Sequence, residues 1–305
     1  MSNGINSDLN GFSQALTSLV ERSSAGVAAV KGGAYRIASG VLLRDGLLAT
    51  ANHTLRREDP VPIQAGGRDF TATILGRDPS IDLAILKADG LDGAALPAAN
   101  PGELKPGMLI AVIGMTLDVG ASASLGILGA VGAQRRTWRG GTLDQFLRLD
   151  VNLYPSQSGA AVVTAAGELI GMATPALSRH STIVIPLATV QRVADELKQQ
   201  GRIRRGYLGV GLQPVRVTES LRSKAGNAES GLIVLSIEPD SPAEAAKLQI
   251  GDILLSLNGH GLSDIEDLQG VLRGEIVGRG AQVHLLRGGE PLQVTVTVAE
   301  RGKEA

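Results

Sequence analysis

The 305-residue chain is short of the residues on which several common functions depend. It contains no cysteine, which excludes disulfide bonds, thiol nucleophiles and cysteine-ligated metals. Aromatic residues make up only 2% of it, so platforms for stacking nucleic-acid bases are not expected. Its 29 basic and 30 acidic residues leave a formal net charge of −1, which gives no bulk attraction to nucleic acid or to anionic membranes. We therefore expect no nucleic-acid partner.

Long apolar runs and metal-binding motifs are also missing. No apolar stretch reaches about 18 residues, so we expect no membrane span. Residues 1–8 lack the positively charged and apolar regions of a signal peptide, and the chain as written is therefore expected to be cytoplasmic. The four histidines are isolated in the sequence and no H-E-x-x-H motif occurs. We expect neither a metal nor another cofactor.

Hydrophobic residues form 43% of the chain and charged residues 19%, which is sufficient for the cores of two domains. Residues 8–23 carry apolar side chains at helical spacing, which predicts a helix with Ser7 or Asp8 as its N-cap. From residue 26 to about residue 185, short apolar runs alternate with glycine-rich turns, which is typical of antiparallel barrels or a sandwich. The predicted strands are residues 27–31, 35–43, 47–51, 69–77, 83–87, 108–113, 126–133, 145–151, 160–163, 168–175 and 181–185.

A helix is predicted next, over residues 186–200, because apolar residues recur on one face and a glycine follows. Residues 207–300 then mix short strands with two short helices, the first capped by Ser241 and the second by Ser263 or Asp264. The sequence thus predicts a mainly β protein of five segments. These are an N-terminal helical segment (1–25), a β-barrel domain (26–186), a helix and linker (187–206), a small α+β domain (207–300) and a tail (301–305).

Three residues with the chemistry of a serine hydrolase occur in the order histidine, aspartate, serine. His53 follows an apolar strand, Asp82 lies in a turn, and Ser158 precedes a glycine on another turn. A serine hydroxyl becomes a nucleophile when an imidazole accepts its proton and a carboxylate orients that imidazole. Each residue alone is as readily explained by packing or turn formation, so the hypothesis depends on all three together.

Several motifs give the chain a close resemblance to the HtrA/DegP family of trypsin-like serine proteases that carry one PDZ domain. The block Leu48–His53 resembles the family's T-x-x-H segment, and Asp82–Lys87 resembles its D-L-A-V-L-K segment. The pair Ser158-Gly159 matches part of the nucleophile motif. Further matching segments are residues 38–41, 112–114, 125–128, 150–152, 167–171, 251–254 and 258–259.

The resemblance implies a chymotrypsin-like double β-barrel with its active site between the barrels, followed by the PDZ domain. It assigns His53 as general base and acid, Asp82 as the group that orients it, and Ser158 as the nucleophile. It places the oxyanion hole at the backbone of Ser156, Gln157 and Ser158, with the N–H groups of Ser156 and Ser158 as donors. The implied function is a serine endopeptidase that acts on unfolded or exposed polypeptides.

The family also suggests an assembly and a location. Its members commonly form homotrimers or higher oligomers through N-terminal residues, which here are residues 8–23. They are often periplasmic or extracytoplasmic, in contrast to the location expected from the N-terminus of the chain as written.

In the second domain, the run Tyr207-Leu208-Gly209-Val210 resembles the carboxylate-binding loop of an HtrA-type PDZ domain. Successive backbone N–H groups in such a loop can bind the C-terminal carboxylate of a peptide, which then adds as a strand. Leu268 and Leu272, on the second predicted helix, could form the wall of the pocket for the last side chain of that peptide. Simple core packing is the alternative for these two leucines.

The chain departs from the family at the nucleophile motif, where G-N-S-G-G is replaced by S-Q-S-G-A over residues 156–160. Serine resists the positive φ that glycine adopts freely, so Ser156 could turn its N–H away from the oxyanion hole. The alternative hypothesis is therefore a weak or inactive protease fold that binds peptides or acts as a chaperone. A further alternative is an esterase that uses the same three residues without proteolysis.

Overall fold

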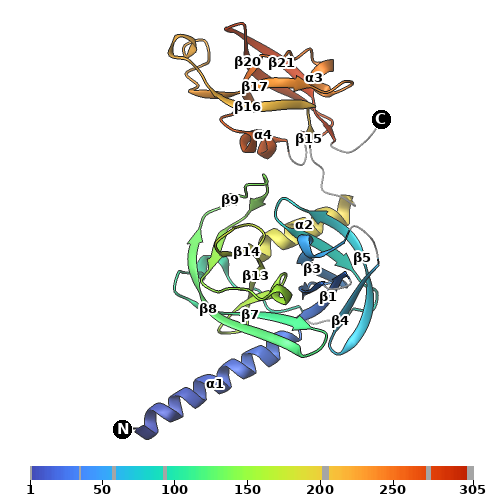
Figure 1. Cartoon of the computed structure of the whole chain (residues 1–305), viewed down its shortest axis with the longest axis vertical. Coiled ribbons are helices and arrows are strands. Elements are labelled where there is room, and N and C mark those ends of the chain that lie inside the picture. Colours follow the sequence, from blue (N-terminus) through green and yellow to red (C-terminus); the bar gives the residue numbers. More distant parts are fainter. Residues whose placement is uncertain are drawn as a thin grey trace. The chain divides into compact units, whose positions relative to one another are not determined.

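The computed structural model (Figure 1) describes residues 2–33, 36–56, 60–91, 95–200, 206–272 and 276–300. The chain divides into two compact units, Met1–Ile203 and Arg204–Ala305. The N-terminal unit contains two closed six-stranded barrels, and the C-terminal unit contains an antiparallel sheet with two short helices. The predicted mainly β fold class, a double barrel followed by a small α+β domain, is confirmed.

The first barrel closes with its strands in the order β1-β2-β3-β6-β5-β4. Strand β3 is buried along its whole length because both of its faces are covered. Leu48 points into the barrel core, whereas Leu47 and Ala49 join a second core that is shared by both barrels. This double burial explains why β3 is apolar except at Thr50 and does not alternate with exposed polar residues. The strands are β1 (Val27–Gly33), β2 (Arg36–Leu42), β3 (Leu47–Ala51), β4 (Val61–Ala65), β5 (Arg68–Asp78) and β6 (Leu83–Lys87).

The second barrel closes in the order β11-β14-β13-β12-β7-β8. Its interior is filled by branched side chains such as Val112, Leu128 and Val184, none of which is exposed to solvent. The short strands β9 (Arg135–Arg136) and β10 (Thr142–Leu143) pair with each other outside this barrel. The barrel strands are β7 (Leu109–Thr116), β8 (Gly120–Gly132), β11 (Phe146–Leu149), β12 (Ala161–Thr164), β13 (Leu169–Thr174) and β14 (Thr182–Pro186).

Two helices accompany the barrels. Helix α2 (Leu187–Gln200) buries Val190, Val193 and Leu197 against the core shared by the two barrels. Helix α1 (Ser2–Ser24) buries Leu19 there with its last turns and then extends away from the barrels, as Figure 1 shows. It begins at Ser2, so the predicted cap at residue 7 or 8 is wrong, because no proline or comparable stop prevents the helix from continuing toward the N-terminus.

In the described part of this unit, three single turns of 3-10 helix connect the strands and helices. They are η1 (Asn52–Thr54) after β3, η2 (Pro101–Glu103) before β7, and η3 (Pro155–Gln157) before β12. Two of them carry predicted site residues, since His53 lies in η1 and Ser158 follows η3. The predicted strand list lacks β4, a five-residue strand whose pattern is interrupted by Pro62.

The C-terminal unit has the sheet order β16-β17-β18-β20-β21, so β16 is an edge strand. The N-caps of the two short helices are at residues that the sequence predicts. Ser241 accepts a hydrogen bond from Glu244 N–H, and Asp264 accepts one from Asp267 N–H. The elements are β15 (Gly206–Tyr207), β16 (Val210–Arg216), η4 (Glu219–Leu221), β17 (Ser230–Ile237), α3 (Pro242–Ala245), β18 (Ile253–Leu257), β19 (His260–Gly261), α4 (Ile265–Val271), β20 (Gly280–Arg287), β21 (Glu290–Thr297) and β22 (Ala299–Glu300).

The apolar pattern of residues 207–212 predicts a single strand, but the structure divides it in two at Leu208 and Gly209. Gly209 has a φ of +78°, which ends the extended conformation. A Cβ at this position would lie 2.2 Å from the Cβ of Ser241, so the close approach of the loop to the cap of α3 requires glycine. The sequence pattern missed this break because both flanking segments are apolar.

Candidate active site

His53 is held at the end of a rigid strand. The buried strand β3 leads directly into η1, in which His53 is the second residue. The preceding Asn52 donates its backbone N–H to the carbonyl oxygen of Asp82 at 3.1 Å. The side chain of His53 is 36% exposed, so one side of the ring faces solvent while the other faces the carboxylate of Asp82.

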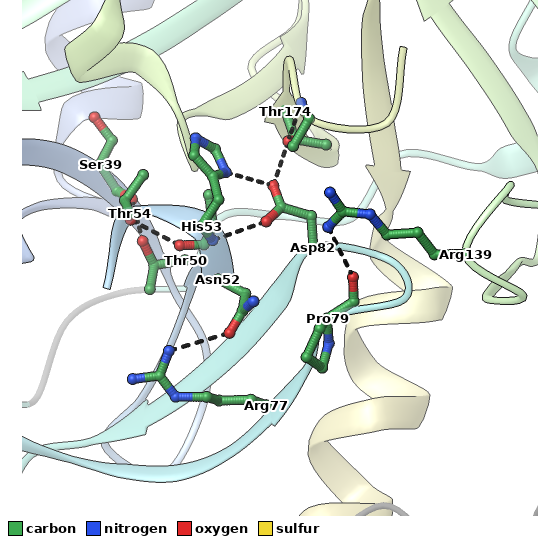
Figure 2. A network of polar contacts seen from close by, with 12 residues as sticks. Ser39, Thr50, Asn52, His53, Thr54, Arg77, Pro79, Asp82, Arg139 and Thr174 are labelled. Atoms are coloured by element: carbon green, nitrogen blue, oxygen red, sulfur yellow. Dashed lines mark hydrogen bonds and ion pairs between the residues drawn. The ribbon is translucent and has the colours of Figure 1, made fainter. Parts of the chain in front are cut away.

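Asp82 lies in the turn between β5 and β6 and is completely buried. Figure 2 shows its carboxylate between His53 and Thr174. Its Oδ1 accepts the backbone N–H of His53 at 2.9 Å, and its Oδ2 lies 2.8 Å from His53 Nδ1. Thr174 Oγ1 donates to the same Oδ2 at 2.5 Å. A carboxylate can only accept here, so Nδ1 carries the ring proton and leaves Nε2 as the basic nitrogen.

The backbone of Asp82 is in an uncommon conformation, with a φ of +57°. For a residue with a side chain, the left-handed region costs roughly 1–2 kcal/mol, so neighbouring contacts must hold it there. Thr137, from the segment between β9 and β10, donates its hydroxyl to the carbonyl oxygen of Ser80 at 2.6 Å. Arg139 reaches the carbonyl oxygen of Pro79 in the same turn, as Figure 2 also shows.

Ser158 is brought to the same region from the second barrel. It follows η3, is only 4% exposed, and its carbonyl oxygen accepts the N–H of Ser39 on β2 at 2.9 Å. A Cβ on Gly159, whose φ is +86°, would lie 2.2 Å from the carbonyl oxygen of Ser39 and 3.1 Å from the backbone nitrogen of Ala51. The Ser158-Gly159 segment therefore packs against the end of β3, two residues before His53.

The backbone around Ser158 forms a closed turn. Ser158 N–H donates to the carbonyl oxygen of Pro155 at 3.3 Å, and Gln157 N–H donates to that of Tyr154 at 2.8 Å. Ser156 is not among the described non-glycine residues with positive φ. Its carbonyl oxygen accepts the hydroxyl of Ser39 at 2.7 Å. In this structure the Ser158 N–H, one of the two expected oxyanion donors, is thus bonded within its own loop.

Sequence reasoning missed the polar residues that hold these groups. Thr174 ends the otherwise apolar strand β13 and is completely buried, yet it bonds Asp82. Thr50 is buried in β3 and donates its hydroxyl to the carbonyl oxygen of Ser39 at 2.7 Å. The available signal was a hydroxyl residue in an otherwise apolar strand, because such a residue needs a hydrogen-bond partner when it is buried.

In the C-terminal unit, the expected carboxylate loop runs from Tyr207 at the end of β15, through Leu208 and Gly209, to Val210 at the start of β16. The carbonyl oxygens of Leu208 and Gly209 accept the N–H groups of Ala243 and Glu238, each at 2.9 Å. The N–H groups of Leu208 and Gly209 donate to no backbone carbonyl within the described residues. A loop whose carbonyl oxygens are hydrogen-bonded while its N–H groups are not is suited to bind an anion.

The remaining predicted residues of this second site belong largely to the core. Leu268 and Leu272 are 5% and 8% exposed and pack in the same cluster as Leu208. Val210 is half-buried on the edge strand β16, and Tyr207 donates its hydroxyl to the carboxylate of Glu238. The structure thus places these residues around β16 and α4, with both leucines packed into the core between the helix and the sheet.

Comparisons with known proteins agree with both units. A trypsin-like peptidase domain model matches residues 38–172, and a PDZ domain model matches residues 206–298. The chain is 30% identical to a probable periplasmic serine endoprotease DegP-like of Pseudomonas fluorescens, and 31% identical to one of Pseudomonas savastanoi pv. phaseolicola. Each of these alignments covers 95% of the chain and 63% of the relative, so the chain spans less than two thirds of the length of these relatives.

Solved structures resemble the whole chain. The HtrA-type protease AlgW with a decapeptide matches with a TM-score of 0.75 at 25% identity, over 94% of this chain and 99% of AlgW. A serine endoprotease from Yersinia pestis matches with a TM-score of 0.74 at 26% identity, over 93% and 97% of the two chains. The chain therefore has the fold and the domain composition of HtrA-type trypsin-like serine proteases with one PDZ domain. Among the described residues, no helix combines the length and apolarity that a membrane span requires.

Proposed function

We propose that this protein is a serine endopeptidase that cleaves unfolded or exposed polypeptides with His53, Asp82 and Ser158. The observation that carries the proposal is the buried Asp82 carboxylate, whose two oxygens accept from the backbone N–H and from Nδ1 of the same histidine. An aspartate held in this way fixes the tautomer of the imidazole and stabilises the imidazolium that forms during the reaction. The position of Ser158-Gly159 against the end of β3 supports the assignment of the nucleophile.

In the proposed mechanism, Ser158 Oγ attacks the carbonyl carbon of the scissile peptide bond while His53 Nε2 accepts its proton. The resulting tetrahedral intermediate collapses when the imidazolium gives that proton to the leaving amine, and an acyl-enzyme remains. Water then attacks the ester, with His53 again acting first as base and then as acid. Asp82 stays ionised throughout and keeps the ring in place.

The intermediate also needs hydrogen-bond donors for its negatively charged oxygen, and removal of one donor typically costs roughly 10²–10³ in kcat. The proposed donors are the N–H groups of Ser156 and Ser158. For both to point at one oxygen, the peptide between Pro155 and Ser156 has to turn, so that the Pro155 carbonyl releases Ser158 N–H. That turn brings Ser156 to positive φ, which is unfavourable for serine. We therefore propose a protease whose resting loop is closed.

For the PDZ domain we propose recognition of peptide C-termini with an apolar last residue. The N–H groups of Leu208 and Gly209 would bind the carboxylate, and the peptide would add as a strand to the open edge of β16. Leu268 and Leu272 would form the wall of the side-chain pocket, which is consistent with their packing in the same cluster as Leu208. The neighbour AlgW was solved with a decapeptide and with a tripeptide, which supports a peptide ligand.

We further propose a homotrimer or higher oligomer assembled through α1. Leu9 and Phe12 on this helix are 61% and 48% exposed. Apolar side chains on a projecting helix are commonly covered by a partner chain. The molar mass of the protein in solution, compared with that of a Phe12→Ser variant, tests this assembly.

One observation favours a second candidate function, that of a peptide-binding or chaperone-like scaffold without proteolysis. The Pro155 carbonyl oxygen accepts the Ser158 N–H, so this donor is not free for an oxyanion. If the loop never opens, the fold retains its peptide-binding surfaces but not the chemistry.

Hydrolysis of fluorescein-labelled casein by the wild type and by Ser158→Ala tests the two candidates. The endopeptidase proposal expects cleavage by the wild type at a rate well above that of the variant. Equal background rates would reject it in favour of the scaffold. A peptide with a free apolar C-terminus and the same peptide amidated at the C-terminus separately test the PDZ proposal by their affinities, because amidation removes the carboxylate.

A further inference from the structure

Gln157 occupies a position from which its side chain can control the loop that precedes Ser158. It is completely buried, in contrast to its exposed neighbours Tyr154 and Pro155. Gln157 Oε1 accepts the backbone N–H of Tyr154 at 3.1 Å, which closes the η3 turn from end to end. Because that N–H can only donate, the oxygen of the amide must face it, and this fixes the orientation of the side chain.

The same amide is anchored to the second barrel through Ser124 on β8. Ser124 Oγ lies 3.0 Å from Gln157 Nε2 and 3.1 Å from Gln157 Oε1. The side chain reaches β8 across Gly114, where an added Cβ would lie 3.1 Å from Gln157 Cγ. The Gln157 side chain thus connects the two ends of its own turn by a hydrogen bond, and it connects the turn to strand β8 through Ser124.

The backbone peptide group that has to rotate for the oxyanion hole to form lies within the turn that the Gln157 side chain bridges. It joins Pro155 to Ser156, and the hydrogen bond from Tyr154 N–H to Gln157 Oε1 spans it. We infer that Gln157 is a positioning residue, whose bonds to Ser124 and Tyr154 hold the loop closed and set the fraction of molecules with a working oxyanion hole. We call these bonds the Gln157 latch. The inference rests on the proposed function only for its effect on turnover, because the latch itself is a structural property.

Gln157→Asn is the most direct test, since it keeps the amide but removes one methylene, so the side chain no longer reaches Ser124 and Tyr154 N–H together. Each lost hydrogen bond is worth a small net amount, so we expect about a tenfold rise in kcat for casein with an unchanged KM. Hydrogen–deuterium exchange of the segment 154–158, followed by mass spectrometry, should become faster, because Ser158 N–H loses its fixed partner.

Ser124→Ala provides a second variant outside the loop, which keeps the inference testable if Gln157→Asn does not fold. It should raise kcat by about threefold and speed exchange in the same segment, since only one end of the latch is lost. Combined with Gln157→Asn, it should add nothing further, because both act on one contact. Ser122→Ala is the matched control on the same strand, since Ser122 Oγ is buried without a hydrogen-bond partner among the described residues.

Unchanged exchange in both Gln157→Asn and Ser124→Ala would overturn the latch, and so would faster exchange accompanied by a lower kcat. An equal response from Ser122→Ala would also overturn it, by showing that any change on β8 loosens the loop. The proposed function fails in a different way. Faster exchange in both variants with no turnover by any form, including the wild type, would leave the latch in place and reject the endopeptidase.

Discussion

The two halves of the candidate site differ in how completely they are built. The half contributed by the first barrel joins His53 to a buried Asp82 by two hydrogen bonds, and Thr174, from β13 of the second barrel, adds a third to the same carboxylate. The half contributed by the second barrel holds Ser158 in a closed turn, with its N–H bonded to Pro155. The difference shows that the base can be preorganised by a buried carboxylate, whereas the donors for the oxyanion belong to a loop with a competing set of hydrogen bonds.

The largest effect on turnover is expected from a substitution of Asp82, in the half of the site that the first barrel contributes. Asp82→Asn keeps the shape but presents an amide to Nδ1, so the imidazole is no longer fixed in the basic tautomer. We expect kcat for casein to fall by about 10⁴ with little change in KM. Asp144→Asn is the control, because Asp144 bonds Thr189 and Arg192 instead of His53. A loss of less than tenfold in Asp82→Asn would mean that the carboxylate does not orient the base.

A smaller loss is expected at Thr174, which supports the same carboxylate. Thr174→Val preserves the volume but removes the hydroxyl that donates to Asp82 Oδ2. A hydrogen bond to a charged group is worth about 1.5–3 kcal/mol, and we expect about a tenfold drop in kcat because Asp82 remains partly oriented by its turn. Thr174→Ser should restore most of the activity. If both variants lost activity equally, packing of the methyl group and not the hydrogen bond would explain the effect.

In the half that the second barrel contributes, a substitution of Ser156 should raise kcat instead of lowering it. Ser156→Gly removes the Cβ that disfavours positive φ, a penalty of roughly 1–2 kcal/mol, and we expect kcat to rise by about tenfold at constant KM. Ser156→Ala is the matched control, since it removes the hydroxyl but keeps the Cβ. A gain in the alanine variant equal to that in the glycine variant would exclude backbone strain as the cause.

The smallest effect is expected at Thr137, in the segment between β9 and β10 that supports the turn of Asp82. Thr137→Val removes the hydroxyl that donates to the carbonyl of Ser80 near Asp82 and that accepts Gly141 N–H. We expect kcat to fall by about threefold, since only the first of these two neutral hydrogen bonds supports the turn of Asp82. Thr137→Ser keeps that bond and should behave as the wild type. Steady-state kinetics at several substrate concentrations would distinguish this change in kcat from a change in KM. An unchanged kcat would show that the Asp82 turn needs no support from this segment.

Much of the fold could be predicted from the sequence because its strands are short apolar runs bounded by turn residues. The strands at residues 47–51 and 83–87 were predicted with the bounds that the structure has. The missed strand β4 contains Pro62, and the break at Gly209 lies between two apolar segments, so local pattern could not indicate either. The resemblance to the HtrA family is confirmed by the comparisons, whereas the roles of the individual site residues stay predictions.

The sequence by itself determined the order and chemistry of His53, Asp82 and Ser158, because these depend on residue type and on the motifs around them. It also indicated that Ser156 could turn its N–H away from the oxyanion hole, because the conformational preference of serine is a local property. Only the tertiary structure decided how these groups are held. Thr174 meets Asp82 from 92 positions away, and Ser124 meets Gln157 from 33 positions away. Such contacts arise from the closure of the barrels, and no local pattern encodes which buried hydroxyl will face which acceptor.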